Sequence, residues 1–267
     1  AMLLVSAEEH LDGDEDHAQA LVLLRQALAL FRQAGDSRGA ADALRMIVMT
    51  CRAKSQATYS KREKVSDPAA LEEATRTAME ELEAFRLASD KYGQACMLNA
   101  LADIALENKA PSASELGGAV EQAATAQGLF RELGERRRQA QVCATLTFLH
   151  LKRQAWQQAE AAAREAVGLA EAAEDKKSIA NALHTLAVCL AQSPSASSCG
   201  ETLEEGLRHA RRALALFKEL NLEKFMASEY YFVATWLLML GRSREALPIA
   251  KTAMRIFKAL NYGKGWQ

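Results

Sequence analysis

The stretch Leu30-Phe31-Arg32-Gln33-Ala34-Gly35 is one copy of a short phrase that recurs along the chain. Clear copies stand at 129–134, 216–221 and 256–261, with weaker ones at 84–85 and 169–170. One marker position can be followed through all copies: Phe31, Phe85, Phe130, Ala170, Phe217 and Phe257. The markers are 54, 45, 40, 47 and 40 residues apart, which is a unit of 40 residues with 14, 5, 0, 7 and 0 residues added. Such a period is typical of repeat architectures.

Small and large apolar residues lie at fixed distances from the markers. Small residues stand ten residues after a marker at Ala41, Ala95, Ala140, Ala180 and Ala227, and eleven before one at Ala20, Ala74, Ala119, Ala159, Gly206 and Ala246. Alanine also stands four residues before most markers, with Glu81 as the exception. Large apolar residues stand sixteen after a marker at Ile47, Leu101, Leu146, Leu186 and Val233. Apolar residues at steps of three and four indicate amphipathic helices, so each unit predicts two helices that approach closely through small side chains.

A helix with one apolar stripe cannot bury that stripe alone, whereas stacked hairpins cover one another and continue the core along the array. We therefore predict an all-α fold, a right-handed α-solenoid of about six helical hairpins, or twelve helices, forming a single domain over residues 1–267. The hairpins are expected at 1–34, 37–88, 91–133, 136–173, 176–220 and 223–260.

The final hairpin differs from the others because the stretch 230–240 is apolar on nearly every side. A terminal repeat normally has a polar outer face, so something is expected to cover this hairpin. The alternatives are the tail with Tyr262 and Trp266, a further repeat, or a second copy of the chain. Together with the Ala1-Met2 start, this favours a segment of a longer protein.

The added residues all fall between the first and second helices of their hairpins. They lie in polar segments that stop helices, at 55–62, 110–114 and 193–198. The second helices then restart at predicted caps: Asp67 before Pro68, a capping box from Ser112 to Glu115, and another from Ser198 to Glu201. Loops on one edge of a repeat array sometimes carry binding, but tolerated insertion is the interpretation we favour.

The chain resembles the tetratricopeptide repeat (TPR) family over essentially its whole length. The best copy of the family pattern is Tyr230, Val233-Ala234, Leu237, Gly241, Ala246 and Ala253. Trp156 also stands three residues before Ala159, where the family usually has an aromatic residue. The small position of the family pattern, here Ala234, is never glycine in this chain, and the usual proline after the second helix is missing. The 40-residue unit is similar to the extended form of kinesin light chains and spindle-orientation adaptors.

The TPR resemblance implies a concave surface lined by the first helix of each hairpin, on which a partner peptide lies. The register assigns these residues to it: Asp42, Arg45, Met49, Arg52, Asn99, Asp103, Gln141, Phe148, Asn181, His184, Tyr231 and Thr235. Leu151, Val188, Ser228 and Leu238 fall in the same register. Asn and Gln amides both donate and accept hydrogen bonds, while Phe148 and Tyr231 offer area for anchoring side chains. The alternative is that these residues merely face solvent.

The clamp with which some TPR domains hold chaperone tails is absent from the sequence. That clamp needs paired Lys, Asn and Arg residues, whereas the matching positions hold Val5 and Glu9, Arg45 and Met49, and Asn99 and Asp103. Binding of chaperone tails is therefore disfavoured.

The charge of the chain is nearly balanced, with 33 Lys and Arg against 34 Asp and Glu. The basic runs at 136–138, 176–177 and 211–212 have acidic neighbours, so we expect neither nucleic acid nor a membrane as partner. The most apolar stretch has 11 residues, well short of the roughly 20 that span a bilayer. Five cysteines without a Cys-x-x-Cys motif suit a reducing compartment, and we expect a cytoplasmic protein.

Motifs that carry chemistry are missing from the sequence. There is no Gly-x-Ser-x-Gly, no glycine-rich phosphate loop, and no histidine spacing that would hold zinc. Cys51, Cys143 and His150 fall at expected core positions, and Cys189 neighbours them. We therefore expect no enzyme activity, no cofactor and no metal. The remaining catalytic alternative is a site assembled from the insertion loops.

These observations predict a non-catalytic adaptor or scaffold that binds a partner's peptide or helix in its groove. The second hypothesis is a structural spacer within a larger protein that forms homo-oligomers through its C-terminal hairpin. Neither the partner nor the biological process follows from the sequence.

Overall fold

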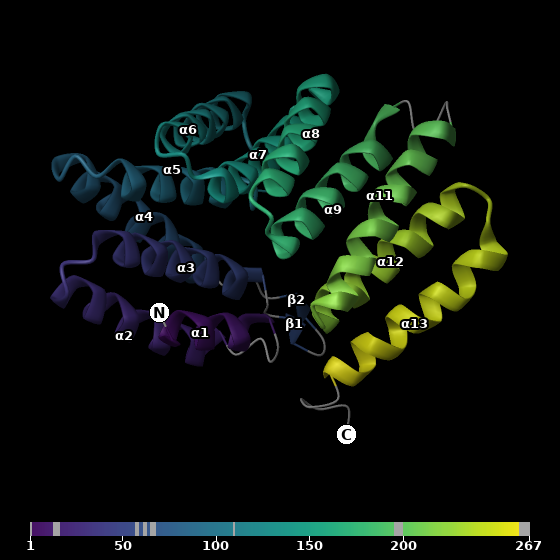
Figure 1. Cartoon of the computed structure of the whole chain (residues 1–267), viewed down its shortest axis with the longest axis horizontal. Coiled ribbons are helices and arrows are strands. Elements are labelled where there is room, and N and C mark those ends of the chain that lie inside the picture. The colour runs from purple at the N-terminus through teal and green to yellow at the C-terminus, as the bar shows by residue number, and fades with distance from the viewer. Residues whose placement is uncertain are drawn as a thin grey trace. The chain divides into compact units, whose positions relative to one another are not determined.

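The computed structural model describes residues 2–12, 17–56, 59–60, 63–64, 68–108, 110–194 and 200–261. The helices of the N-terminal half are α1 (Met2–Asp12), α2 (His17–Gln33), α3 (Ser37–Gln56), α4 (Pro68–Leu87), α5 (Lys91–Ala105) and α6 (Ala113–Glu132) (Figure 1). Those of the C-terminal half are α7 (Arg136–Lys152), α8 (Trp156–Ala172), α9 (Lys176–Gln192), α11 (Gly200–Glu219), α12 (Glu223–Met239) and α13 (Ser243–Asn261). The predicted all-α fold of paired helices is confirmed.

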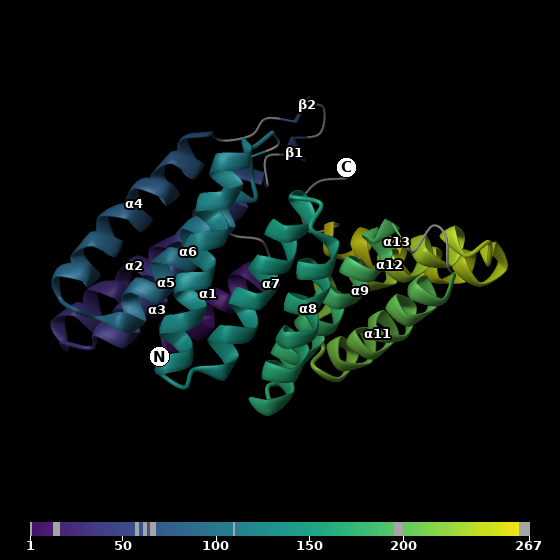
Figure 2. The same ribbon diagram turned by 90° about the horizontal axis from the view of Figure 1, so that it is seen from above.

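The chain divides into two compact units, Ala1–Glu135 and Arg136–Gln267. In unit 1, α1 pairs with α2, α3 with α4 and α5 with α6, and in unit 2, α7 pairs with α8, α9 with α11 and α12 with α13. The second helix of a hairpin also packs on the first helix of the next, as α2 does on α3, α4 on α5, α8 on α9 and α11 on α12. Figure 2 shows α7, α8 and α9 side by side in this way. Each unit is thus a stack of helical hairpins, as in an α-solenoid.

The small residues of the repeat are buried where helices meet. Ala41, Ala95, Ala140, Ala180 and Ala227 are at most 4% exposed, and Ala20, Ala74, Ala119, Ala159 and Ala246 are at most 3% exposed. Gly206 on α11 is closer still to its neighbour, because a Cβ atom built there would lie 3.3 Å from the carbonyl oxygen of Ala187 on α9. Small side chains therefore set the distance between neighbouring helices, as the register predicts.

Two register positions depart from the common pattern. Leu101 is only half-buried, although its counterparts Ile47, Leu146, Leu186 and Val233 are at most 7% exposed. Glu81, the exception among the alanines, forms an ion pair with Arg32 of α2 at 2.5 Å. The prediction that Leu101 is as buried as Leu186 is therefore wrong, because Leu101 is only half-buried.

The recurring phrase is the C-terminal end of the second helix. Its last position has a left-handed backbone in each hairpin that continues into another, with φ of 68° at Gly35, 55° at Ser89, 72° at Gly134, 54° at Glu174 and 55° at Asn221. The next amide then donates to the carbonyl of the marker, as Asp36 does to Phe31 at 2.9 Å. This is the Schellman motif, which satisfies carbonyls that the helix end leaves open.

An aspartate after the phrase begins the next helix in three of the turns. The side chain of Asp36 accepts from the amide of Gly39 at 2.8 Å, that of Asp90 from Gly93 at 3.0 Å, and that of Asp175 from Lys177 at 3.2 Å. Such side chains occupy amide donors that the first turn of a helix cannot pair internally. One short segment thus ends one helix and starts the next.

The insertions agree in part with expectation. Ser112 and Glu115 form the predicted capping box, with the Ser112 amide donating to Glu115 at 2.7 Å. Residues 67 and 195–199, which include the other two predicted caps, lie outside the described part of the chain, although α4 begins at Pro68 as predicted. The expected loop at 55–62 is corrected: α3 continues to Gln56, and strands β1 (Tyr59–Ser60) and β2 (Glu63–Lys64) pair antiparallel.

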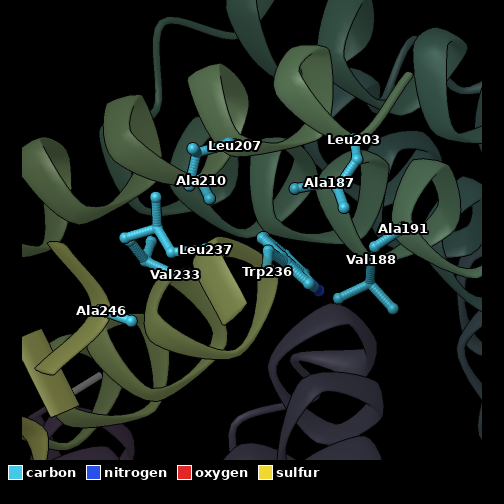
Figure 3. Close-up of a cluster of buried hydrophobic side chains, with 10 residues drawn as sticks. All are labelled: Ala187, Val188, Ala191, Leu203, Leu207, Ala210, Val233, Trp236, Leu237 and Ala246. Carbon is cyan, nitrogen blue, oxygen red and sulfur yellow. The ribbon is translucent and has the colours of Figure 1, made fainter. Parts of the chain in front are cut away.

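A cluster of buried side chains joins α9, α11, α12 and α13 in unit 2. Figure 3 shows Trp236 of α12 between small and branched residues of the neighbouring helices. The apolar stretch of α12 is therefore covered on the side of Val233, Trp236 and Leu237, while Tyr231 and Leu238 stay more than half exposed.

Glycine-to-alanine changes should alter the free energy of unfolding in opposite directions at two positions, one inside α6 and one in the turn that follows it. Gly134→Ala places a Cβ atom on a residue with φ of 72°, so we expect it to lower the free energy of unfolding by about 1 kcal/mol. Gly128→Ala lies inside α6 with open space around the new methyl group, so it should raise that free energy by about 0.5 to 1 kcal/mol. Urea unfolding followed by circular dichroism measures both, and equal signs would contradict the turn assignment.

Truncation at the large apolar positions should follow burial. Leu186→Ala removes a side chain that is 2% exposed and should cost about 2 to 5 kcal/mol, with a smaller cost for half-buried Leu101→Ala. Glu81→Ala loses only a solvent-accessible ion pair and should cost less than about 1 kcal/mol. Thermal and urea unfolding would show the order, and a cost at Glu81 equal to that at Leu186 would reject the register.

Candidate protein interaction surface

The residues assigned to the concave surface all lie on the first helices of hairpins, in two sets that belong to different units. The set of unit 1 comprises Asp42, Arg45, Met49 and Arg52 on α3, with Asn99 and Asp103 on α5. The set of unit 2 comprises Gln141 and Phe148 on α7, Asn181 and His184 on α9, and Tyr231 and Thr235 on α12.

In unit 1, Asp42 holds two hairpins together. It accepts a hydrogen bond from the hydroxyl of Tyr92 on α5 at 2.9 Å. The Tyr92 ring lies edge-on to Phe130 and under the guanidinium of Arg38, which is 4.5 Å from the ring centre. A hydrogen bond with Glu135 raises the pKa of Arg38. Much of the hydrogen-bonding capacity of Asp42 is therefore used inside the unit.

A second polar group of unit 1 joins the C-terminal ends of α3 and α5. Arg52 donates from Nη1 to the carbonyl oxygen of Asp103 at 3.3 Å and lies 3.6 Å from a carboxylate oxygen of Glu107. Asn99 donates to the carboxylate of Asp103 at 3.4 Å and is 8% exposed. The structure thus brings Arg52, Asn99 and Asp103 together, but mainly to contact one another.

In unit 2 the first helices bring aromatic rings together. Phe232 of α12 lies 5.0 Å from the His184 ring, 5.6 Å from Tyr231 and 5.8 Å from Trp236, measured between ring centres. Phe148 of α7 packs against the same buried cluster as Phe232. We define Phe148, His184, Tyr231 and Phe232 as the aromatic patch. Ring contacts join the last three, and Phe148 packs on the same cluster as Phe232.

Polar side chains beside the aromatic patch keep part of their hydrogen-bonding capacity. Asn181 is exposed on α9. Gln141 accepts from Arg138 at 2.9 Å through its carbonyl oxygen, and the Thr235 hydroxyl donates to the backbone of Tyr231 at 3.0 Å. Asn181 is thus an open amide one helical turn before His184, while Tyr231 of α12 is 56% exposed.

One residue of this region escaped the sequence analysis. Glu229 of α12 is 1% exposed, and its Oε2 lies 2.6 Å from Nδ1 of His184. It stands twelve residues after the marker Phe217, where the other hairpins have apolar residues. A charged residue at a core position of the register was therefore the signal that could have found it.

The basic runs of the sequence are paired within unit 2. Arg137 lies 2.8 Å from Asp175, and Arg212 lies 2.8 Å from Glu171. Similar pairs join second helices of neighbouring hairpins, as Arg164 of α8 does with Glu205 of α11 at 2.8 Å. This hydrogen bond lowers the pKa of Glu205. Such exposed pairs contribute little stability each, but they reduce the positive field that a phosphate backbone would require.

Groups with chemical potential are mostly buried or isolated. Cys51, Cys96, Cys143 and Cys189 are buried, and burial raises the pKa of Cys189 to about 11, so little of it is thiolate at neutral pH. His150 is only partly buried, less than expected, and burial lowers its pKa. Within the described ranges no group of His, Cys, Asp and Glu has the arrangement of a metal site.

An open hollow of about 660 Å³ lies on the outer side of α4 in unit 1. Its described lining residues are Leu71, Glu72, Thr75, Arg76, Met79 and Glu80, all from this one helix. It includes none of the residues assigned to the concave surface.

No helix among those described combines the length and the apolar character needed to cross a membrane.

Comparison with known proteins identifies the fold but no family. No family profile and no curated protein matches the chain by sequence. Among solved structures, the apo form of RapI is similar with a TM-score of 0.61 and 16% identity, over 96% of this chain and 83% of its own. A signal transduction ATPase with a tetratricopeptide repeat sensor from Pyrococcus horikoshii has a TM-score of 0.59 and 13% identity, over 93% of this chain. Aspartyl phosphate phosphatase F from Bacillus subtilis has a TM-score of 0.55 and 14% identity, over 86%.

The chain spans 36% of the length of that ATPase and 55% of the length of that phosphatase. At identities this low, the similarity concerns the fold alone. The paired helices, the buried alanine register and these structures together show that the chain has a TPR-like helical repeat fold.

Proposed function

We propose that the chain is a non-catalytic interaction scaffold that binds an extended peptide segment of a protein partner. The aromatic patch of unit 2 carries the proposal, because Tyr231 is 56% exposed on α12 and Asn181 presents an exposed amide on α9, one helical turn before His184. Exposed aromatic side chains supply contact area at protein interfaces, and a side-chain amide can both donate to and accept from a peptide backbone. The first helices of unit 1 are a weaker candidate, since Asp42, Arg52 and Asn99 already contact neighbours.

The repeat length supports a scaffold of the extended TPR kind that kinesin light chains and spindle-orientation adaptors contain. The 40-residue unit and the Schellman turns recur in both units. One similar structure is named a phosphatase. In this chain, however, the described cysteines are buried, and the aromatic patch contains no nucleophile beside its histidine. We therefore propose binding and not catalysis as the function of the chain, in the reducing, cytoplasmic setting that we expect from the sequence.

The proposal predicts that peptide binding depends on unit 2. Random 12-residue peptides displayed on phage and selected on the wild-type chain should bind the double variant Asn181→Ala, Tyr231→Ala at least about tenfold more weakly, since interface anchors contribute about 2 kcal/mol or more. The matched control is Gln157→Ala, Arg208→Ala, which changes exposed residues on α8 and α11. Binding that survives the first variant and falls with the control would reject this surface.

Self-association is the second candidate function, and α13 favours it. Leu247, Met254 and Phe257 lie on one side of this helix and are 58%, 52% and 36% exposed. The corresponding marker on α11, Phe217, is 2% exposed because Phe225 and Met226 of the next hairpin pack around it. Tyr262 and Trp266, which were considered as a cover, lie outside the described residues.

If α13 mediates self-association, the wild-type chain should form dimers whose fraction rises with concentration in sedimentation velocity. Met254→Lys with Phe257→Glu places charges on the exposed apolar side and should leave a monomer with unchanged circular dichroism. A wild-type chain that stays monomeric at the highest concentration would contradict this candidate.

A further inference from the structure

A single carboxylate interrupts the buried apolar positions of the first helices. At the register position of Glu229 the preceding hairpins have Ala43, Met97, Val142 and Ala182, which are at most 3% exposed. Glu229 is as buried as they are, at 1% exposed. An ionised carboxylate in such a place costs several kcal/mol unless it is compensated, so its presence calls for a partner or a function.

The described residues compensate Glu229 only in part. Its Oε2 is 2.6 Å from Nδ1 of His184, whereas its Oε1 has no hydrogen-bond partner among the described residues. A carboxylate can only accept, so we assign the proton of this bond to Nδ1. In the neutral imidazole the other ring nitrogen, Nε2, is then an acceptor too. The pair therefore has one acceptor that a ligand can reach, Nε2 of His184, with a buried carboxylate behind it.

The His184 side chain connects this charge to the surface of unit 2. It is 26% exposed, while Glu229 behind it is 1% exposed. Among the described residues, Nε2 of His184 makes no hydrogen bond, and its ring lies against Phe232 at 5.0 Å. Tyr231 is in turn edge-on to Phe232 at 5.6 Å. An acceptor thus lies at the edge of an aromatic patch whose rings attract cations through their faces.

We propose that His184 and Glu229 form a recognition site for a basic side chain, lysine or arginine, of the bound peptide. This rests on the proposed function and adds the chemistry of the ligand. An ammonium or guanidinium group carries donors only and matches the acceptor Nε2 of His184, whereas a carboxylate would meet a like charge. Glu229 acts through His184 as a positioning residue, because its own oxygens are buried.

The alternative is that the pair only ties α9 to α12. Glu229→Met separates the two explanations, since Met97 occupies the same register position and is fully buried. If the carboxylate is kept for binding, its buried oxygen without a hydrogen-bond partner costs stability, so removing it should raise the melting temperature by about 2 to 4 °C. A purely structural tie predicts a fall in melting temperature and leaves peptide selectivity unchanged, and that result would overturn the proposal.

The decisive experiment selects the random 12-residue peptides on the wild-type chain and, in parallel, on Glu229→Gln, which keeps the shape and removes the charge. Wild-type peptides should share a basic residue, and its replacement by norleucine should weaken binding to the wild type by at least about tenfold. The same replacement should change binding to Glu229→Gln less than about twofold. Selected peptides without a shared basic residue, or an equal loss on both proteins, would overturn the inference and leave peptide binding intact.

Failure of peptide selection on both proteins would instead reject the proposed function, and the inference with it. Nitrogen-15 NMR of the histidine ring gives an independent check on the full chain. The proton should reside on Nδ1 of His184 and leave a lone pair on Nε2. A proton on Nε2, whether or not Nδ1 also carries one, would make the open atom a donor and would overturn the choice of a basic ligand.

Discussion

The close contact of helices at small residues is the constraint on which the rest of this structure depends. An amphipathic helix is stable here only when its stripe meets another, and buried alanines allow neighbouring backbones to approach within van der Waals contact. At Gly206 even a methyl group would press on the carbonyl of Ala187. Because the same small positions recur in every hairpin, the same packing recurs, and each unit becomes a stack instead of a bundle around one centre.

The turns make this packing repeat in register. A residue with a left-handed backbone ends each second helix that leads into another hairpin, and in three of these turns an aspartate then begins the next first helix. Glycine occupies the left-handed position in Gly35 and Gly134, but Ser89, Glu174 and Asn221 take it elsewhere at a conformational cost. The surrounding helices must outweigh that cost, so local preference and tertiary packing are in mild conflict at these turns.

The exceptions to the repeat are as informative as the repeat. Glu81 replaces an alanine and finds Arg32 on a neighbouring hairpin, at a position where solvent also reaches it. Glu229 replaces an apolar residue at a position that solvent does not reach, and among the described residues its side chain forms a hydrogen bond only with His184. The first exception is an ordinary surface ion pair. The second places a carboxylate that is compensated only in part behind an aromatic surface, where a low dielectric constant strengthens its electrostatic interactions.

The sequence alone determined the period, the number of hairpins, the small positions at the helix contacts and the capping box at Ser112, because these depend on spacing along single helices. It also placed the assigned surface residues on the first helices. Only the tertiary structure decided which of them contact each other, as Arg52 does Asp103, and which stay open, as Asn181 does. It likewise decided that Leu101 is half-buried and that His184 meets Glu229. The reason is that a register predicts which face of a helix a residue occupies, whereas partners and burial depend on side chains contributed by helices distant in sequence.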